Sequence, residues 1–126
     1  MKTILVDARK TFITQEGINV DMKKLLDTYK NRKIVVTNAT IEEQEKLWIV
    51  NMPYEVFSLE HNPDKIDPQY FSTLLDKFSL TPNDVLYFEH NENAVNSARS
   101  LGIVAYHYDK DKKNIDELKQ FLDKNI

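Results

Sequence analysis

The sequence contains no cysteine and only two glycines, Gly17 and Gly102. The absence of cysteine excludes disulfides, Cys-based zinc sites and thiol catalysis. Two isolated glycines cannot build a glycine-rich phosphate loop. The apolar run at residues 4–6 is far too short for a signal-peptide core or a membrane span. These absences favour a cytoplasmic protein that does not bind a membrane.

The charge of the chain is small and dispersed. Its 126 residues carry a formal net charge of −3, and the lysines are scattered along the sequence, so neither nucleic acid nor an anionic membrane is expected as a partner. A chain of this length buries roughly two-thirds of its unfolded surface around one core. We therefore expect a single domain over residues 1–126.

Short apolar segments alternate with segments of helical periodicity. The expected strands cover residues 4–6, 34–36, 54–59, 85–88 and 103–106, and a small hairpin turns at Gly17. The helices are expected to begin at capping residues or to end at Gly102, and one of them carries Trp48 towards the core. The expected capping residues are Asp21, Thr40, Asp67 and Asn114. This alternation predicts an α/β fold, a three-layer sandwich with a five-stranded parallel sheet.

Polar side chains follow several of these strands. Asp7 comes after the first strand, Thr37 and Asn38 after the second, and Glu89 after the fourth, followed by His90. Ligands of open α/β sheets bind at the carboxyl ends of the strands, so these residues are candidates for chemistry. His90 is interpreted either as a hydrogen-bonded strand-end residue or as a proton-transfer group or metal ligand. His61 and His107 are expected at the surface.

Asp7, Thr37, Lys65 and Glu89 follow the order and spacing of the four motifs of the haloacid dehalogenase-like (HAD) superfamily, which the chain resembles over nearly its whole length. The resemblance is most specific at residues 64–103, where a lysine stands two residues before Asp-Pro and an apolar strand ends in Glu89. It implies a HAD-like Rossmannoid sheet with the strands in the order fifth, fourth, first, second, third, so that Asp7 and Glu89 face each other.

The resemblance also implies a magnesium-dependent phosphohydrolase acting through an aspartyl-phosphate. Asp7 would be the nucleophile and, with Glu89, a magnesium ligand. Thr37 would bind the phosphoryl group through its hydroxyl, with Asn38 beside it, and Lys65 would supply the cation. The substrate would be phosphorylated.

Three departures from the family pattern predict weak or lost activity. Arg9 occupies the position of the family's acid–base aspartate, and a guanidinium does not exchange protons near neutral pH. Glu89 and His90 replace an Asp-Asp pair, and Ala94 stands where an asparagine is usual. No interval is long enough for a cap domain, so a macromolecular substrate, or a lid from an oligomer, is more plausible than an enclosed metabolite.

Two other classes stay open. In the first, the chain is a catalytically silent HAD-like module that binds a protein partner, and Arg9 pairs with Asp7 and Glu89 in place of the metal charge. The second is a phosphoacceptor receiver domain of similar length. It is less well supported because the chain offers Asp7-Ala8 after the first strand and Glu60-His61 after the third, rather than paired acids and an aspartate.

Overall fold

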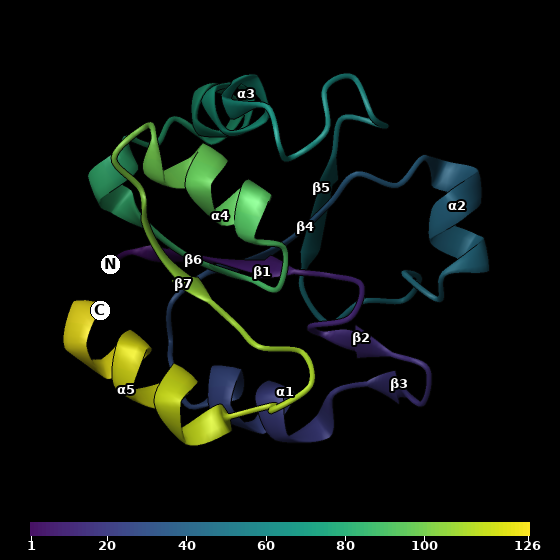
Figure 1. Cartoon of the computed structure of the whole chain (residues 1–126), viewed down its shortest axis with the longest axis vertical. Coiled ribbons are helices and arrows are strands. Elements are labelled where there is room, and N and C mark those ends of the chain that lie inside the picture. Colours follow the sequence, from purple (N-terminus) through teal and green to yellow (C-terminus); the bar gives the residue numbers. More distant parts are fainter.

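A five-stranded parallel sheet forms the centre of the molecule in the computed structural model, which describes residues 1–126. Its strand order is β5-β4-β1-β6-β7, which confirms the order expected from the resemblance (Figure 1). The strands have these bounds: β1 Thr3–Asp7, β4 Lys33–Thr37, β5 Glu55–Ser58, β6 Val85–Glu89 and β7 Val104–His107.

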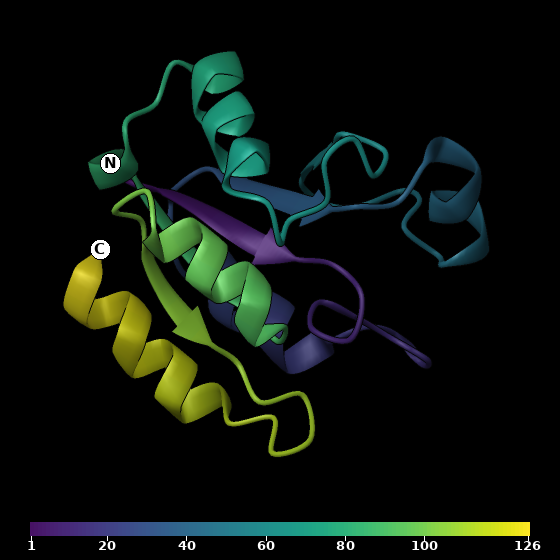
Figure 2. The ribbon, with the colours of Figure 1, turned by 45° about the horizontal axis from the view of Figure 1, so that its top comes forward.

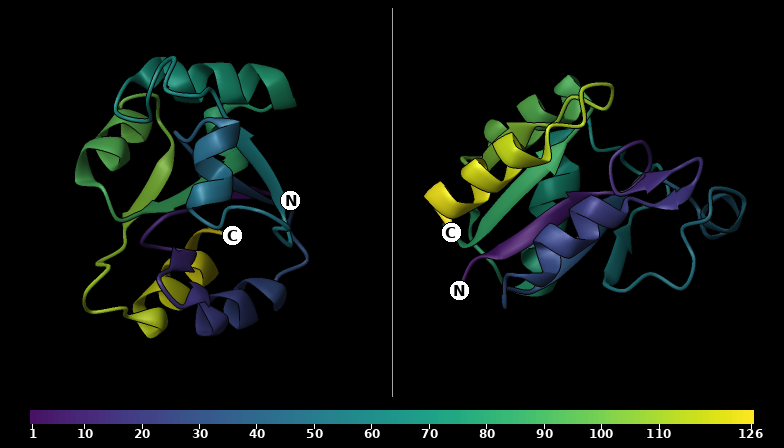
Figure 3. Two further views of the ribbon diagram at one scale, coloured as in Figure 1. Left: turned by 90° about the vertical axis from the view of Figure 1, so that its right-hand side faces the viewer. Right: turned by 90° about the horizontal axis from the view of Figure 1, so that it is seen from below.

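Helices cover both faces of this sheet. α1 (Val20–Asp27) and α5 (Ile115–Asn125) lie side by side on one face. α3 (Pro68–Phe78) and α4 (Glu92–Arg99) lie on the other, as the left view of Figure 3 shows. A short 3₁₀ turn, Pro82–Asp84, leads into β6. The result is the three-layer α/β sandwich predicted from the sequence.

Strand periodicity divides the core between the two faces. Along β1, Ile4 and Val6 belong to the apolar cluster beneath α1 and α5, whereas Leu5 belongs to the cluster beneath α3 and α4. Successive side chains of a strand point to opposite faces, so a strand covered on both sides is apolar at every position. All five residues of β1 are buried, and the sheet holds its central strand rigidly up to Asp7.

The helix starts are close to those expected. Asp67 caps α3, with Pro68 in its first turn, Thr40 and Glu43 form a capping box, and Asn114 caps α5. The expected cap at Asp21 is wrong by two residues, since the side chain of Asn19 accepts the bond from the backbone N–H of Met22. Asn19 is the earlier residue with a side-chain acceptor and an extended backbone, which is what a capping position requires.

Trp48 does not reach the core. α2 ends at Lys46 and contains no buried residue, and Trp48 adopts a φ of 62°, which turns the chain out of the helix. Helical spacing therefore stops applying before Trp48, whose side chain is 72% exposed, and Ile49 is buried in its place. The prediction of Trp48 as a core residue is wrong.

Two small elements stand beyond the carboxyl ends of the strands. The hairpin of β2 (Ile13–Thr14) and β3 (Gly17–Ile18) follows β1, and α2 (Ile41–Lys46) follows β4. Both lie at the end of the sheet towards which β1 points (Figure 2). The intervals that precede α1 and α3 contain no cap domain. None of the helices has the length and the apolar character needed to cross a membrane.

Candidate active site

The strand register places the two predicted acids together at the carboxyl end of the sheet. Val6 pairs with Phe88 across β1 and β6, so Asp7 and Glu89 are the next residues on adjacent strands. Both carboxylates are buried, with 1% and 0% of the residue exposed. Buried carboxylates require donors or cations on their oxygens, and the surrounding residues provide both.

Lys65 bridges the two acids. Its Nζ lies 2.6 Å from Asp7 Oδ1 and 2.7 Å from Glu89 Oε1. The ammonium arrives from the loop between β5 and α3. Asn38, at the end of β4, fixes this loop because its Oδ1 accepts a 2.7 Å bond from the backbone N–H of Lys65. The structure thus places Lys65, the predicted cation, against both acids and adds a positioning contact for Asn38.

Different donors serve the second oxygen of each acid. Asp7 Oδ2 accepts a 2.6 Å bond from the hydroxyl of Thr11 and a 2.5 Å bond from Nδ1 of His90. The same Nδ1 lies 3.2 Å from Glu89 Oε2, which also accepts a bond from the backbone N–H of Asn91. The Tyr87 hydroxyl donates to Glu89 Oε1. Each carboxylate oxygen therefore has at least one donor.

Burial and charge shift the pKa values of these groups in opposite directions. Burial disfavours the charged form of Asp7, but Lys65 and His90 outweigh it and hold the pKa of Asp7 below its usual range. Burial and the neighbouring Asp7 charge raise the pKa of Glu89. Burial opposes protonation of His90, but its bonds to Asp7 and Glu89 raise the pKa of His90 to about 9. At neutral pH, a protonated His90 and Lys65 face the two acids.

Thr37 lies beside this cluster. It is buried at the end of β4, and its hydroxyl accepts a 3.2 Å bond from the backbone N–H of Ala39. Thr37, Asn38 and Lys65 line one cavity of about 220 Å³ together with Asp7 and Glu89. The structure therefore brings the residues of all four predicted motifs to a single cleft, which has room for a small anion such as a phosphoryl group.

Arg9 differs from its expected placement. It is exposed at the rim of the cleft and makes no ion pair or side-chain hydrogen bond with Asp7 or Glu89. The predicted pairing of Arg9 with the two acids is wrong because Lys65 and His90 already contact all four of their oxygens. The chain leaves β1 in a tight turn, with Lys10 at a φ of 67°.

Sequence reasoning missed two residues of the site and left one open. Thr11 is fully buried against Asp7, and a hydroxyl four residues after the strand-end acid was the available indication. Tyr87 lies two residues before Glu89 on β6, so the two side chains point to the same face of the sheet. Its apolar neighbours in the sequence, however, predicted only a core role. His90 is hydrogen-bonded at the strand end, and its interpretation as a proton-transfer group or metal ligand stays a prediction. His61 is half-exposed, as expected, yet it lies 2.7 Å from both Glu43 and Asp64.

One group of side chains has the donors and spacing for a metal ion. Potential ligand atoms of Asp7, Glu89 and His90 lie within 4.8 Å of one another. Magnesium prefers oxygen ligands, so Asp7 Oδ2 and Glu89 Oε2 fit it, whereas the imidazole nitrogen that contacts both oxygens does not. The acid pair thus suits magnesium once His90 moves away from these oxygens.

Solved structures share this fold over most of their length. An uncharacterised protein of Corynebacterium glutamicum matches with a TM-score of 0.65 at 15% identity, covering 98% of this chain and 96% of that one. A HAD-family enzyme of Bacteroides thetaiotaomicron, an aspartate-to-alanine mutant in complex with magnesium and inorganic phosphate, matches with a TM-score of 0.64 at 13% identity, covering 85% and 93%.

Other matched structures are longer than this chain. A HAD-superfamily hydrolase of Geobacter sulfurreducens matches with a TM-score of 0.57 at 19% identity, covering 73% of this chain and 47% of its own, so the chain spans about half the length of several structures that it matches. No protein-family profile matches the sequence, and the curated proteins give no match either. At these identities the likeness establishes the fold alone, which this chain shares with solved HAD-family structures.

Proposed function

We propose that the cleft binds a phosphoryl group and accepts it on Asp7, in the manner of magnesium-dependent phosphohydrolases, with slow or lost turnover. One observation carries this proposal. A buried, ionised aspartate ends the central strand, and a lysine beside it at 2.6 Å opens onto a cavity of about 220 Å³. A phosphoryl group there would meet a nucleophile and a cation together.

The residues divide the chemistry between them. A carboxylate oxygen of Asp7 attacks phosphorus, a new oxygen–phosphorus bond forms, and the bond to the leaving oxygen breaks, with the electron pair going to that oxygen. Lys65 and the hydroxyl of Thr37 offer a charge and a hydrogen bond to the phosphoryl oxygens. Asp7 Oδ2 and Glu89 Oε2 would hold magnesium. When bound, magnesium supplies charge compensation for the phosphoryl oxygens.

Slow turnover follows from the side chain at position 9. The leaving oxygen needs a proton unless it departs as a stable anion, and the water that hydrolyses the phosphoenzyme must lose a proton. Arg9, at the rim of the cleft, neither donates the first proton nor accepts the second. Because general acid–base catalysis contributes a factor of about 10² to 10⁴ to the rate, its loss makes turnover slow. We therefore expect acyl and aryl phosphates, whose leaving groups are stable anions, to react better than alkyl phosphates.

Phosphorylation by acetyl phosphate tests the proposal. The protein is incubated with acetyl phosphate and magnesium and then analysed by intact-mass spectrometry, with Asp7→Asn as the control. We expect the mass gain of one phosphoryl group, absent from the control and stable enough to detect because hydrolysis is slow. An unmodified mass under these conditions, with the fold intact by circular dichroism, would overturn the proposal.

A second candidate is a silent module that binds a partner without chemistry. The contact of His90 Nδ1 with both Asp7 Oδ2 and Glu89 Oε2 favours it, because a protonated imidazole at this place supplies a positive charge without a metal. In this form of the hypothesis His90, rather than Arg9, takes the role of the metal charge. Unchanged thermal stability on adding magnesium would support it, since a ligand that binds the native state raises stability.

A further inference from the structure

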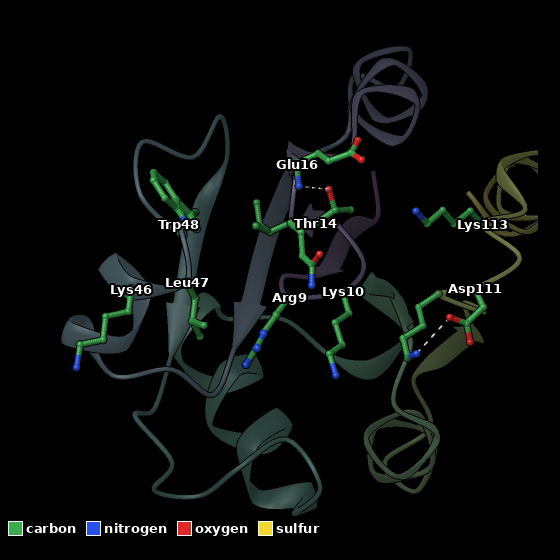
Figure 4. Close-up of a pocket in the computed structure, with 12 residues that line it drawn as sticks. Arg9, Lys10, Thr14, Glu16, Lys46, Leu47, Trp48, Asp111 and Lys113 are labelled. Atoms are coloured by element: carbon green, nitrogen blue, oxygen red, sulfur yellow. Dashed lines mark hydrogen bonds and ion pairs between the residues drawn. The ribbon is translucent and has the colours of Figure 1, made fainter.

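A second, larger cavity adjoins the cleft. It has a volume of about 660 Å³ and lies between the end of α2, the β2–β3 hairpin and the turn that precedes α5 (Figure 4). Arg9 and Leu47 line both cavities, so the two are contiguous. We call this second cavity the basic groove. Its volume is in the range of small-molecule sites.

The basic groove is rich in cations although the chain as a whole is acidic. Five cationic side chains line it: Arg9, Lys10, Lys46, Lys110 and Lys113. Only Lys110 forms an ion pair, with Asp111 at 3.3 Å, and Glu16 is the other carboxylate of the lining. The remaining four cations are exposed and make no ion pair, so the groove presents positive charge that a polyanion can use.

Trp48 stands at one side of the basic groove, next to Leu47. Figure 4 shows these two residues on the α2 side and Lys113 pointing inward from the opposite side, with Arg9 and Lys10 between them. The indole is 72% exposed, so its ring is available to stack against a planar ligand. An exposed aromatic face among cations is the combination that recognises a base attached to phosphates.

We propose that the basic groove binds a nucleotide, with the base against Trp48 and the phosphates on Arg9 and Lys10. Arg9 and Leu47 connect the groove to the cleft, and this arrangement directs a phosphate of the same ligand towards Asp7. The assignment of that phosphate to Asp7 rests on the proposed function, whereas binding in the groove does not. A ligand with a planar ring and several phosphates contacts both the indole of Trp48 and the cations of the groove. Inorganic phosphate contacts the cations alone.

The single tryptophan of the chain makes the test direct, because Trp48 is the only source of indole fluorescence. The protein is titrated with adenosine triphosphate in magnesium-free buffer at low ionic strength, with adenosine and tripolyphosphate as partial ligands. We expect saturable quenching by the nucleotide, dissociation constants at least tenfold higher for each partial ligand, and weaker binding as salt is added.

Charge variants identify the location. Lys10→Glu and Lys113→Glu should each raise the dissociation constant about tenfold. Lys30→Glu, which makes the same charge change at an exposed lysine outside the groove, should leave it unchanged. Trp48→Ala, measured by calorimetry, should weaken nucleotide binding but not tripolyphosphate binding. Equal effects of Lys10→Glu and Lys30→Glu, or tighter binding of an acidic phosphopeptide than of the nucleotide, would overturn the proposal.

This test separates the two proposals. Acetyl phosphate carries no base, so phosphorylation of Asp7 reports on the cleft alone. Nucleotide quenching in magnesium-free buffer reports on the groove alone, and we expect it to persist in Asp7→Asn. Quenching without phosphorylation would support the groove while overturning the proposed function. Phosphorylation without quenching would do the reverse.

Discussion

The Nδ1 of His90 lies 2.5 Å from the Oδ2 of Asp7, although 83 positions separate these residues in the sequence. The same nitrogen lies 3.2 Å from Oε2 of Glu89. A single protonated ring therefore contacts the two carboxylate oxygens that face each other at the carboxyl end of the sheet. Any divalent cation that uses these oxygens has to compete with His90, and this competition gives the first prediction.

Replacing His90 should strengthen magnesium binding. In His90→Asn the imidazolium is gone, the two oxygens lose a positive neighbour, and their affinity for a divalent cation rises. We expect at least a tenfold decrease in the magnesium dissociation constant by isothermal titration calorimetry. Arg9→Gln is the matched control, because it also removes one positive charge from the cleft lining and Arg9 makes no ion pair with either acid. A gain from Arg9→Gln as large as that from His90→Asn would contradict this account of the site.

The stability that His90 contributes should depend on pH. Its pKa in the folded protein is about 9, above the value of about 6.5 for an unfolded histidine. Because the pKa is raised, protonated His90 adds to the free energy of unfolding. This contribution is fully present below pH 6.5 and is lost as the pH rises through 9. Urea unfolding of the wild type and His90→Gln should show a stability difference that is largest at pH 6 and shrinks by pH 9.5. A pH-independent difference would indicate packing alone.

Removing Lys65 should destabilise the fold strongly. Lys65→Met leaves Asp7 Oδ1 and Glu89 Oε1 buried without their cation, and breaking a buried ion pair from one side costs about 3–5 kcal/mol of unfolding free energy. Urea unfolding at pH 7 measures it, with Lys30→Met as the surface control. The double variant Lys65→Met, Glu89→Gln should recover part of the loss because one buried charge disappears. A double variant less stable than the single one would show that charge is not the cause.

Much of the fold follows from local sequence. Strand-length apolar runs such as those around Val35 and Leu86, separated by helices with clear capping residues, are enough to predict a parallel sheet. Trp48 was misplaced because helical spacing gives no warning of where a helix ends. Trp48 has a left-handed backbone, and the chain then buries Ile49, three residues after the helix. No helical pattern includes such a turn.

The part of the site that lies directly at the strand ends was predictable from the sequence. Asp7 and Glu89 were predictable as strand-end acids, whereas their position opposite each other, and the place of Lys65 before Asp-Pro, were implied by the resemblance to the HAD superfamily. The contact of His90 with Asp7 depends on the rotamer that the His90 side chain adopts above the sheet, and the spacing of residues in the sequence does not predict this rotamer. The basic groove could not be predicted either, because its cations come from three separate segments that look scattered in the sequence.

Calorimetric titration with magnesium and beryllofluoride tests the central claim most directly, because beryllofluoride mimics an aspartyl-phosphate without the need to know the substrate. We predict saturable binding at one site that requires both components and disappears in Asp7→Asn. Binding of neither component to the wild type, with the fold intact, would contradict the claim that the cleft accepts a phosphoryl group on Asp7.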